Sequence, residues 1–160
     1  MYKLIITLLL AVITLGGCAS HPETSVDPMT GIKTETLRIG SFPSPMYLRC
    51  SEGVMALAVE PPSLQDYQPV AVPNGRVKME MKIGDTYLKV NAKTFTNSWT
   101  NFYTLDSRAI EALVTVDDPN NQVWVRVRHG EADAGAVALG FDTQAKQEAQ
   151  AFITTCKTGA

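Results

Sequence analysis

The sequence has few of the residues on which enzyme sites are most often built. Its 160 residues include two histidines and three cysteines, and only His129 lies outside the N-terminal segment. The sequence contains no Gly-x-Ser-x-Gly elbow, no His-Glu-x-x-His pair and no phosphate-binding loop. A Ser-His-Asp triad would have to use His129, and no serine stands in a recognisable nucleophile turn. We therefore predict a protein that is not an enzyme, with no catalytic residues and no cofactor.

Groups of metal-binding side chains are also scarce. His129, Glu131 and Asp133 alternate along the chain, a spacing that would let them project together as ligands. A polar hairpin loop explains this segment better, because it is rich in Gly and Ala. The acidic stretch that begins at Asp117 lacks the twelve-residue pattern of a calcium loop, and a solvated turn is the favoured interpretation. We therefore predict no metal site.

Neither sign of charge dominates. Fourteen Lys and Arg residues face sixteen Asp and Glu residues, for a net charge of −2. A nucleic-acid-binding domain normally carries a basic excess, so we expect no nucleic-acid partner. The length is that of one domain, which excludes a multidomain enzyme.

Long apolar runs are missing except at the N-terminus. The uncharged run Leu4–Leu15 is shorter than the ~20 residues that a membrane-spanning helix needs, but it has the length of a signal-peptide core. Leu15-Gly16-Gly17-Cys18 then resembles a bacterial lipobox, with Cys18 as the acylated residue. The alternative is an ordinary secretory signal followed by a coincidental cysteine. Ala19, rather than Asp, favours the outer membrane.

These features predict a lipoprotein in three parts. Residues 1–17 form a signal peptide, residues 18–34 a lipidated N-terminus and polar tether, and residues 35–160 a single periplasmic domain. The lipid, palmitate-type acyl chains on Cys18, would hold the domain on the periplasmic side of the bacterial outer membrane. Within the tether, residues 27–31 read as a turn.

The remaining two cysteines favour a disulfide. Cys50 and Cys156 are an even pair in a compartment that is expected to be oxidising. A redox-active pair is less favoured, because the sequence has no Cys-x-x-Cys motif. A metal site is also disfavoured, because no matching histidine pair accompanies them.

Alternating hydrophobicity predicts a mostly β domain. The pattern predicts strands with one buried face at residues 34–39, 46–50, 55–59, 77–83, 88–92, 123–128 and 136–141. We also predict a mobile loop at 129–135 and a long irregular connection at 60–75. A short helix capped by Ser107 and a C-terminal helix capped by Asp142 complete the pattern. In the C-terminal helix, Cys156 lies on the apolar face. We predict an α+β fold: a curved antiparallel sheet or small β-sandwich, with helices on one side and a Cys50–Cys156 disulfide.

Cations and aromatic residues occupy outward positions of these strands. If the strands are neighbours, they form a basic face that would dock an acidic protein surface or an anionic glycan. The alternative is a solvated sheet face interleaved with Glu80, with Trp124 packed under a helix. The aromatic stretch 97–104 is better explained by core packing of Trp99 and Phe102. The predicted partner-binding residues are Arg49, Tyr87, Lys89, Trp124, Arg126 and Arg128.

Three short motifs resemble one known family. The motifs are Tyr47-Leu48-Arg49-Cys50, Val123-Trp124-Val125-Arg126-Val127 and Gly140-Phe141-Asp142, the last of which leads into a helix that ends at Cys156. They resemble the TagO-like accessory proteins of type VI secretion. The invasion-associated periplasmic proteins share a similar cysteine-ended layout. This chain departs from both in its lipobox and its lysine-rich central hairpin. The resemblance implies a disulfide-stapled fold and a non-enzymatic envelope role.

Together these features predict a binding or assembly accessory of a cell-envelope complex, with a secretion complex as one setting. The partner is expected to be a protein in the envelope. The alternative is an inhibitor or immunity-type protein that blocks an envelope enzyme through residues 60–75 or the turn at 117–121. A small hydrolase or metal protein using His129 is the least favoured possibility.

Overall fold

The structure, a computed structural model, describes residues 21–39, 46–59, 76–96, 100–118, 120, 122–129 and 132–159. These residues form nine strands and two helices. The elements, in chain order, are β1 (Glu23–Val26), β2 (Lys33–Ile39), β3 (Met46–Ser51), β4 (Val54–Val59), β5 (Arg76–Ile83), β6 (Thr86–Thr96), β7 (Thr100–Thr104), α1 (Ser107–Thr115), β8 (Gln122–His129), β9 (Ala132–Gly140) and α2 (Thr143–Thr158).

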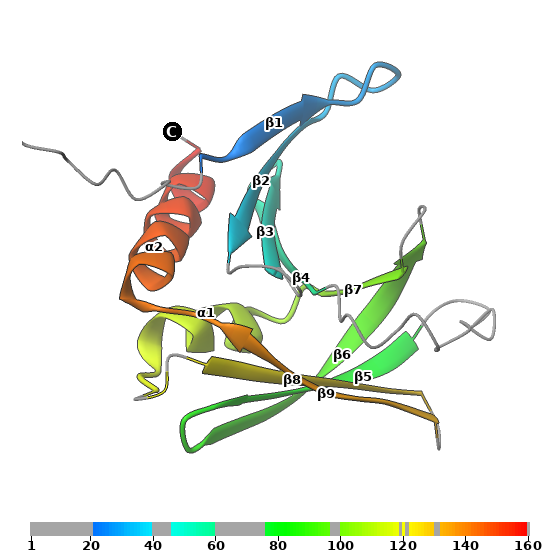
Figure 1. Cartoon of the computed structure of the whole chain (residues 1–160). Helices are drawn as coiled ribbons and strands as arrows, with labels where there is room; N and C mark the ends of the chain where they lie inside the picture. Colours follow the sequence, from blue (N-terminus) through cyan, green and yellow to red (C-terminus); the bar gives the residue numbers. More distant parts are fainter. Residues whose placement is uncertain are drawn as a thin grey trace, which may run out of the picture.

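All nine strands belong to one antiparallel sheet with the order β1-β2-β3-β4-β7-β6-β5-β8-β9. The sheet is open and strongly curved, and both helices lie inside the curve (Figure 1). Helix α2 contacts β2, β3 and β4, and α1 contacts β4, β5 and β6. The predicted α+β class with helices on one side is confirmed, and the architecture is the curved sheet, not the sandwich.

The core fills the space between the sheet and the two helices. Strict alternation along β3, β5 and β8 sends every second side chain inward, because successive side chains of a strand point to opposite faces. The helices close the core with one apolar stripe each. The fully buried side chains include Leu37, Met46, Leu48, Leu57, Met79, Met81, Leu113 and Leu139.

Helix α2 begins as predicted, and α1 begins one residue earlier. The Asp142 carboxylate accepts a hydrogen bond from the Ala145 amide at 2.8 Å. The predicted cap at Ser107 is wrong: Asp106 is the N-cap, and its carboxylate accepts from the Arg108 amide at 3.0 Å. Both residues are good caps, and aspartate in addition binds the Arg108 guanidinium. Ser107 is the first helical residue.

The predicted disulfide is present. Cys50 on β3 and Cys156 in the last turns of α2 form it, with a Cα–Cα distance of 5.8 Å. Both cysteines are at least nine-tenths buried. The bond therefore fixes the C-terminal helix to the strand on which it packs.

Two predicted irregular segments are partly regular. Residues 23–26 and 33–34, predicted as tether, form β1 and the start of β2; the turn between the strands is confirmed, with Asp27 accepting from Met29 and Thr30. All four residues of β1 are exposed, so the strand has no apolar face for the sequence to reveal. The predicted mobile loop at 129–135 is also wrong, because β8 extends to His129 and β9 begins at Ala132.

Several predictions concern parts of the chain that the structure does not describe. They are the core packing of the Trp99 and Phe102 side chains, the long connection at 60–75, Cys18 and the predicted signal peptide. The backbone of residues 100–104 forms β7, a strand between β4 and β6 that hydrophobic alternation did not indicate.

Candidate binding surface

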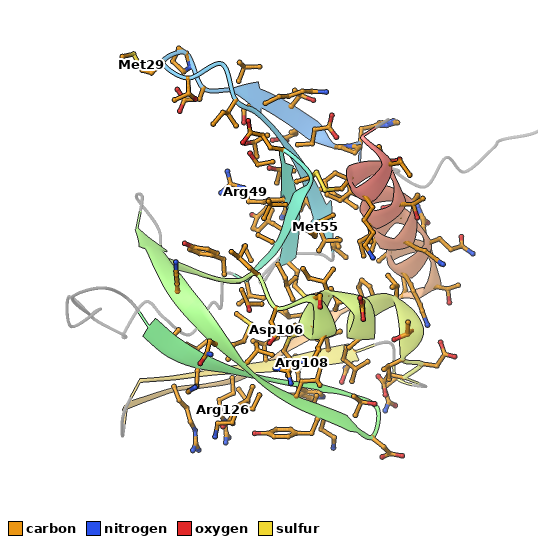
Figure 2. The ribbon with its side chains drawn as sticks, turned by 180° about the vertical axis from the view of Figure 1, so that it is seen from behind. Met29, Arg49, Met55, Asp106, Arg108 and Arg126 are labelled. Atoms are coloured by element: carbon orange, nitrogen blue, oxygen red, sulfur yellow. A yellow bond between two sulfur atoms is a disulfide. The ribbon has the colours of Figure 1, made fainter. Side chains whose placement is uncertain are left out.

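The outward side chains of β5, β6 and β8 form one continuous basic surface. These strands are neighbours in the order β6-β5-β8, as the hypothesis of a basic face requires. Opposite Glu80 lie Lys89 on β6 and Arg126 on β8, and opposite Lys78 lies Arg128. We call this surface the basic face; its members are Lys78, Glu80, Lys82, Tyr87, Lys89, Trp124, Arg126 and Arg128. Figure 2 shows Arg126 pointing away from α1, on the outside of the sheet.

Glu80 is the one acid of the basic face and lies at its centre. Although it points outward, it is only 8% exposed, because the surrounding long side chains cover it. Its carboxylate lies 3.2 Å from the Lys89 ammonium and 3.9 Å from Arg128 Nε. Burial raises the pKa of Glu80, but hydrogen bonds from Lys89 and Tyr87 and the charge of Arg128 outweigh it and hold the pKa below its ordinary value. One ionised carboxylate at the centre of the basic face therefore binds Lys89 and Arg128 directly.

We expect Glu80→Gln to lower the stability at neutral pH by about 1–2 kcal/mol, because the variant loses hydrogen bonds to a charge and leaves the cations to repel one another. A group whose pKa is lowered by folding stabilises the protein above its unfolded pKa, and this contribution is lost as the pH falls through the folded pKa. The gap between wild type and variant should therefore shrink as the pH falls below 4.5.

Urea unfolding at several pH values measures this gap. Glu111→Gln, at an exposed position of α1, is the matched control and should change stability little at any pH. A gap for the Glu80 variant that is constant from pH 7 to pH 3 would contradict the proposed role of its carboxylate.

Aromatic rings flank the cations at one end of the basic face. Lys82 lies opposite Tyr87 on one side and opposite Trp124 on the other, so the three form a row across neighbouring strands. Tyr87 is 57% exposed and Trp124 is 45% exposed. The alternative that Trp124 packs under a helix is therefore wrong. Large exposed rings beside cations are typical of the centres of protein interfaces.

One predicted site residue lies apart from the others. Arg49 is on β3, and β4 and β7 separate it from β6. It points away from α2, on the outer side of the sheet, whereas Met55 on β4 points toward the core (Figure 2). The structure thus brings together Tyr87, Lys89, Trp124, Arg126 and Arg128, and does not place Arg49 among them.

A pocket that the sequence did not reveal lies next to the basic face. It has a volume of about 370 Å³ and is open to solvent. It forms where β7 ends and the chain turns inward to start α1. Its walls are Asn91, Ala92, Lys93, Tyr103, Thr104, Leu105 and Asp106. The only sequence signal was an apolar residue, Leu105, shortly before a predicted helix start.

The acidic turn after α1 serves the fold. The Asp117 carboxylate binds the Lys146 ammonium of α2, and Asp118 accepts a hydrogen bond from the Gln122 amide at 2.8 Å. The turn also abuts the β5–β6 connection: a Cβ on Gly84, whose φ is +53°, would meet the Asp117 carbonyl oxygen at 2.9 Å. Both carboxylates thus have partners within the protein, and the Asp117 side chain stays exposed, as a solvated turn requires.

The side chains of His129, Glu131 and Asp133 lie outside the described residues. Among the residues that are described, no three His, Cys, Asp or Glu side chains gather as a metal site would require. In the same part of the chain, neither helix is long and apolar enough to cross a membrane.

Comparison with other proteins adds no relative: no protein-family profile, no curated protein and no solved structure matches this chain.

Proposed function

We propose that this chain is a non-enzymatic, lipid-anchored binding module of the bacterial envelope, which docks an acidic surface of a partner protein on its basic face. The observation that carries the proposal is the separation of charge. The whole chain has a net charge of −2, whereas the basic face gathers five cations around one carboxylate. Such a concentration favours a partner of opposite charge and speeds its association.

The residue types on the basic face support a protein partner. Arg, Tyr and Trp are enriched in protein interfaces, and ion pairs with Glu80 hold Lys89 and Arg128 in place. A preorganised surface loses less conformational entropy on binding than one with mobile lysines.

The envelope setting rests on the N-terminal segment and the disulfide. Leu15-Gly16-Gly17-Cys18 has the form of a lipobox, and Cys50–Cys156 is a bond that persists in oxidising compartments such as the periplasm. We place the domain on the periplasmic side of the outer membrane, held by acylated Cys18. Residues 60–75, one proposed inhibitory element, lie outside the described residues, and no observation favours an inhibitor over an assembly accessory.

The test of docking is a charge reversal. Lys82→Glu with Arg126→Glu should reduce the envelope protein recovered with the cross-linked, detergent-solubilised chain by at least about tenfold, because two favourable charges become repulsive. Quantitative mass spectrometry of the recovered protein measures the loss.

The matched control is Lys33→Glu with Lys157→Glu, which changes the same total charge on β2 and α2. It should leave recovery near the wild-type level. Equal losses in both double variants would show that net charge matters rather than the basic face, and unchanged recovery in both would remove the basic face as the docking surface.

A further inference from the structure

We propose that the pocket at the end of β7 receives an apolar side chain of the acidic segment that docks on the basic face. This inference rests on the proposed function and deepens it: the partner would present an apolar anchor residue flanked by carboxylates. Its first support is the position of the pocket. The successive outward residues of β6, spaced about 7 Å apart, lead from the basic face into the pocket. They are Tyr87, Lys89, Asn91 and Lys93.

A hydrogen bond joins the two parts of this surface. The Lys78 ammonium on β5 donates to the side-chain carbonyl of Asn91, which lines the pocket. The basic face and the pocket therefore lie on one continuous outer surface. An extended segment that follows β6 would meet cations first and the pocket about four residues later.

The walls of the pocket suit an apolar group. Leu105 is 54% exposed and Tyr103 is half-buried, so together they offer apolar surface that a ligand would remove from water. Exposed Lys93 stands at the rim, where it favours a carboxylate next to the buried group. The volume of about 370 Å³ falls in the range of pockets that bind ligands and admits an aromatic side chain.

The floor of the pocket is already fixed. The buried Thr104 hydroxyl donates a hydrogen bond to the backbone carbonyl of Asn91 at 2.7 Å and accepts one from the backbone amide of Asp106 at 3.1 Å. The Asp106 carboxylate is in turn held by Arg108, whose guanidinium hydrogen bond holds the pKa of Asp106 below its ordinary value. A floor that is already ordered lowers the entropic cost of binding a ligand.

The chemistry of the walls selects a protein segment over another polyanion. A nucleic acid or an anionic glycan would use the cations of the basic face, but an aliphatic wall at Leu105 gains nothing from phosphate or sulfate groups. A peptide carries carboxylates and apolar side chains on neighbouring residues, and so can use both parts of the surface.

The test uses two synthetic peptides and the full mature chain. In both, Glu and Gly alternate around one central residue, which is Phe in one peptide and Ser in the other. We expect the Phe peptide to bind at least about tenfold more tightly, and the Leu105 methyl and Lys93 amide NMR signals to shift with the Phe peptide alone. Leu105→Gln should remove this preference, whereas Met29→Gln, at a 91% exposed position on the β1–β2 hairpin, should keep it.

The outcomes separate the pocket from the basic face. Equal affinity for the two peptides, both weakened by Lys82→Glu, would overturn the pocket and leave the proposed function standing. If neither peptide binds, the result contradicts both the anchor pocket and the proposed docking on the basic face. Heparin that binds more tightly than the Phe peptide, without an effect of Leu105→Gln, would overturn the peptide anchor in favour of a glycan. The NMR shifts of the wild-type chain decide the matter even if Leu105→Gln fails to fold.

Discussion

Replacing both cysteines of the Cys50–Cys156 disulfide with alanine should lower the free energy of unfolding by about 3–4 kcal/mol. The bond closes a loop with a sequence separation of 106 residues, so it restricts most of the domain in the unfolded state. Because both cysteines are buried where α2 packs on β3, the change also leaves a void in the core. A domain of ordinary stability would keep only a small margin after such a loss.

Guanidinium unfolding of the oxidised wild type, the reduced wild type and the double variant measures this effect. The reduced wild type keeps both side chains and separates the loss of the cross-link from the loss of packing. We expect it to be destabilised nearly as much as the double variant. A change below about 1 kcal/mol on reduction would contradict the stapling role of the bond.

Cys18 is expected to decide where the protein resides. When an ordinary cleavable secretory signal replaces residues 1–17 and Cys18 becomes Ser, the chain should move from the membrane fraction to the soluble periplasmic fraction almost completely. Acyl chains contribute about 0.8 kcal/mol for each buried CH₂ group, so an anchor of several chains holds a protein stably on the membrane, and without it the domain should be released.

Detergent phase partitioning and the mass of the N-terminal peptide together report on this anchor. The wild-type peptide should begin at Cys18 and carry the mass of the acyl chains. The Cys50→Ala and Cys156→Ala variant is a suitable control, because it loses two cysteines but keeps Cys18, the predicted lipid site. An unmodified Cys18 in the wild type would refute the lipoprotein assignment and leave the basic face untouched.

The sequence predicts well those parts of the fold that have two distinct faces. In β3, β5 and β8 every second residue is apolar and faces inward, so the strands and their inward residues could be identified. The Cys50–Cys156 pair could be predicted because each cysteine falls on an apolar face. Strand β1 could not be predicted, because all of its residues are exposed and it is held by backbone pairing with β2.

The composition of the binding surface was predictable, but its extent was not. Outward positions of β5, β6 and β8 follow from alternation alone, whereas the pairings of β4 with β7 and of β5 with β8 join strands that are distant in sequence. The separation of Arg49 from the other cations follows from this order. The pocket depends on how β7 ends beside β6 and turns into α1, a juxtaposition that no local pattern encodes.

The early start of β1 leaves only a short segment between Cys18 and the folded domain. Five residue steps separate Cys18 from Glu23, the first residue of the sheet, and a chain of that length reaches at most about 17 Å. With Cys18 acylated, as proposed, the domain could not swing freely above the bilayer. The side that carries the start of β1 and the end of α2 would stay next to the headgroups. Strands β5 and β8 lie at the opposite end of the molecule (Figure 1), so the basic face would be directed into the periplasmic space, within reach of a partner that approaches from there.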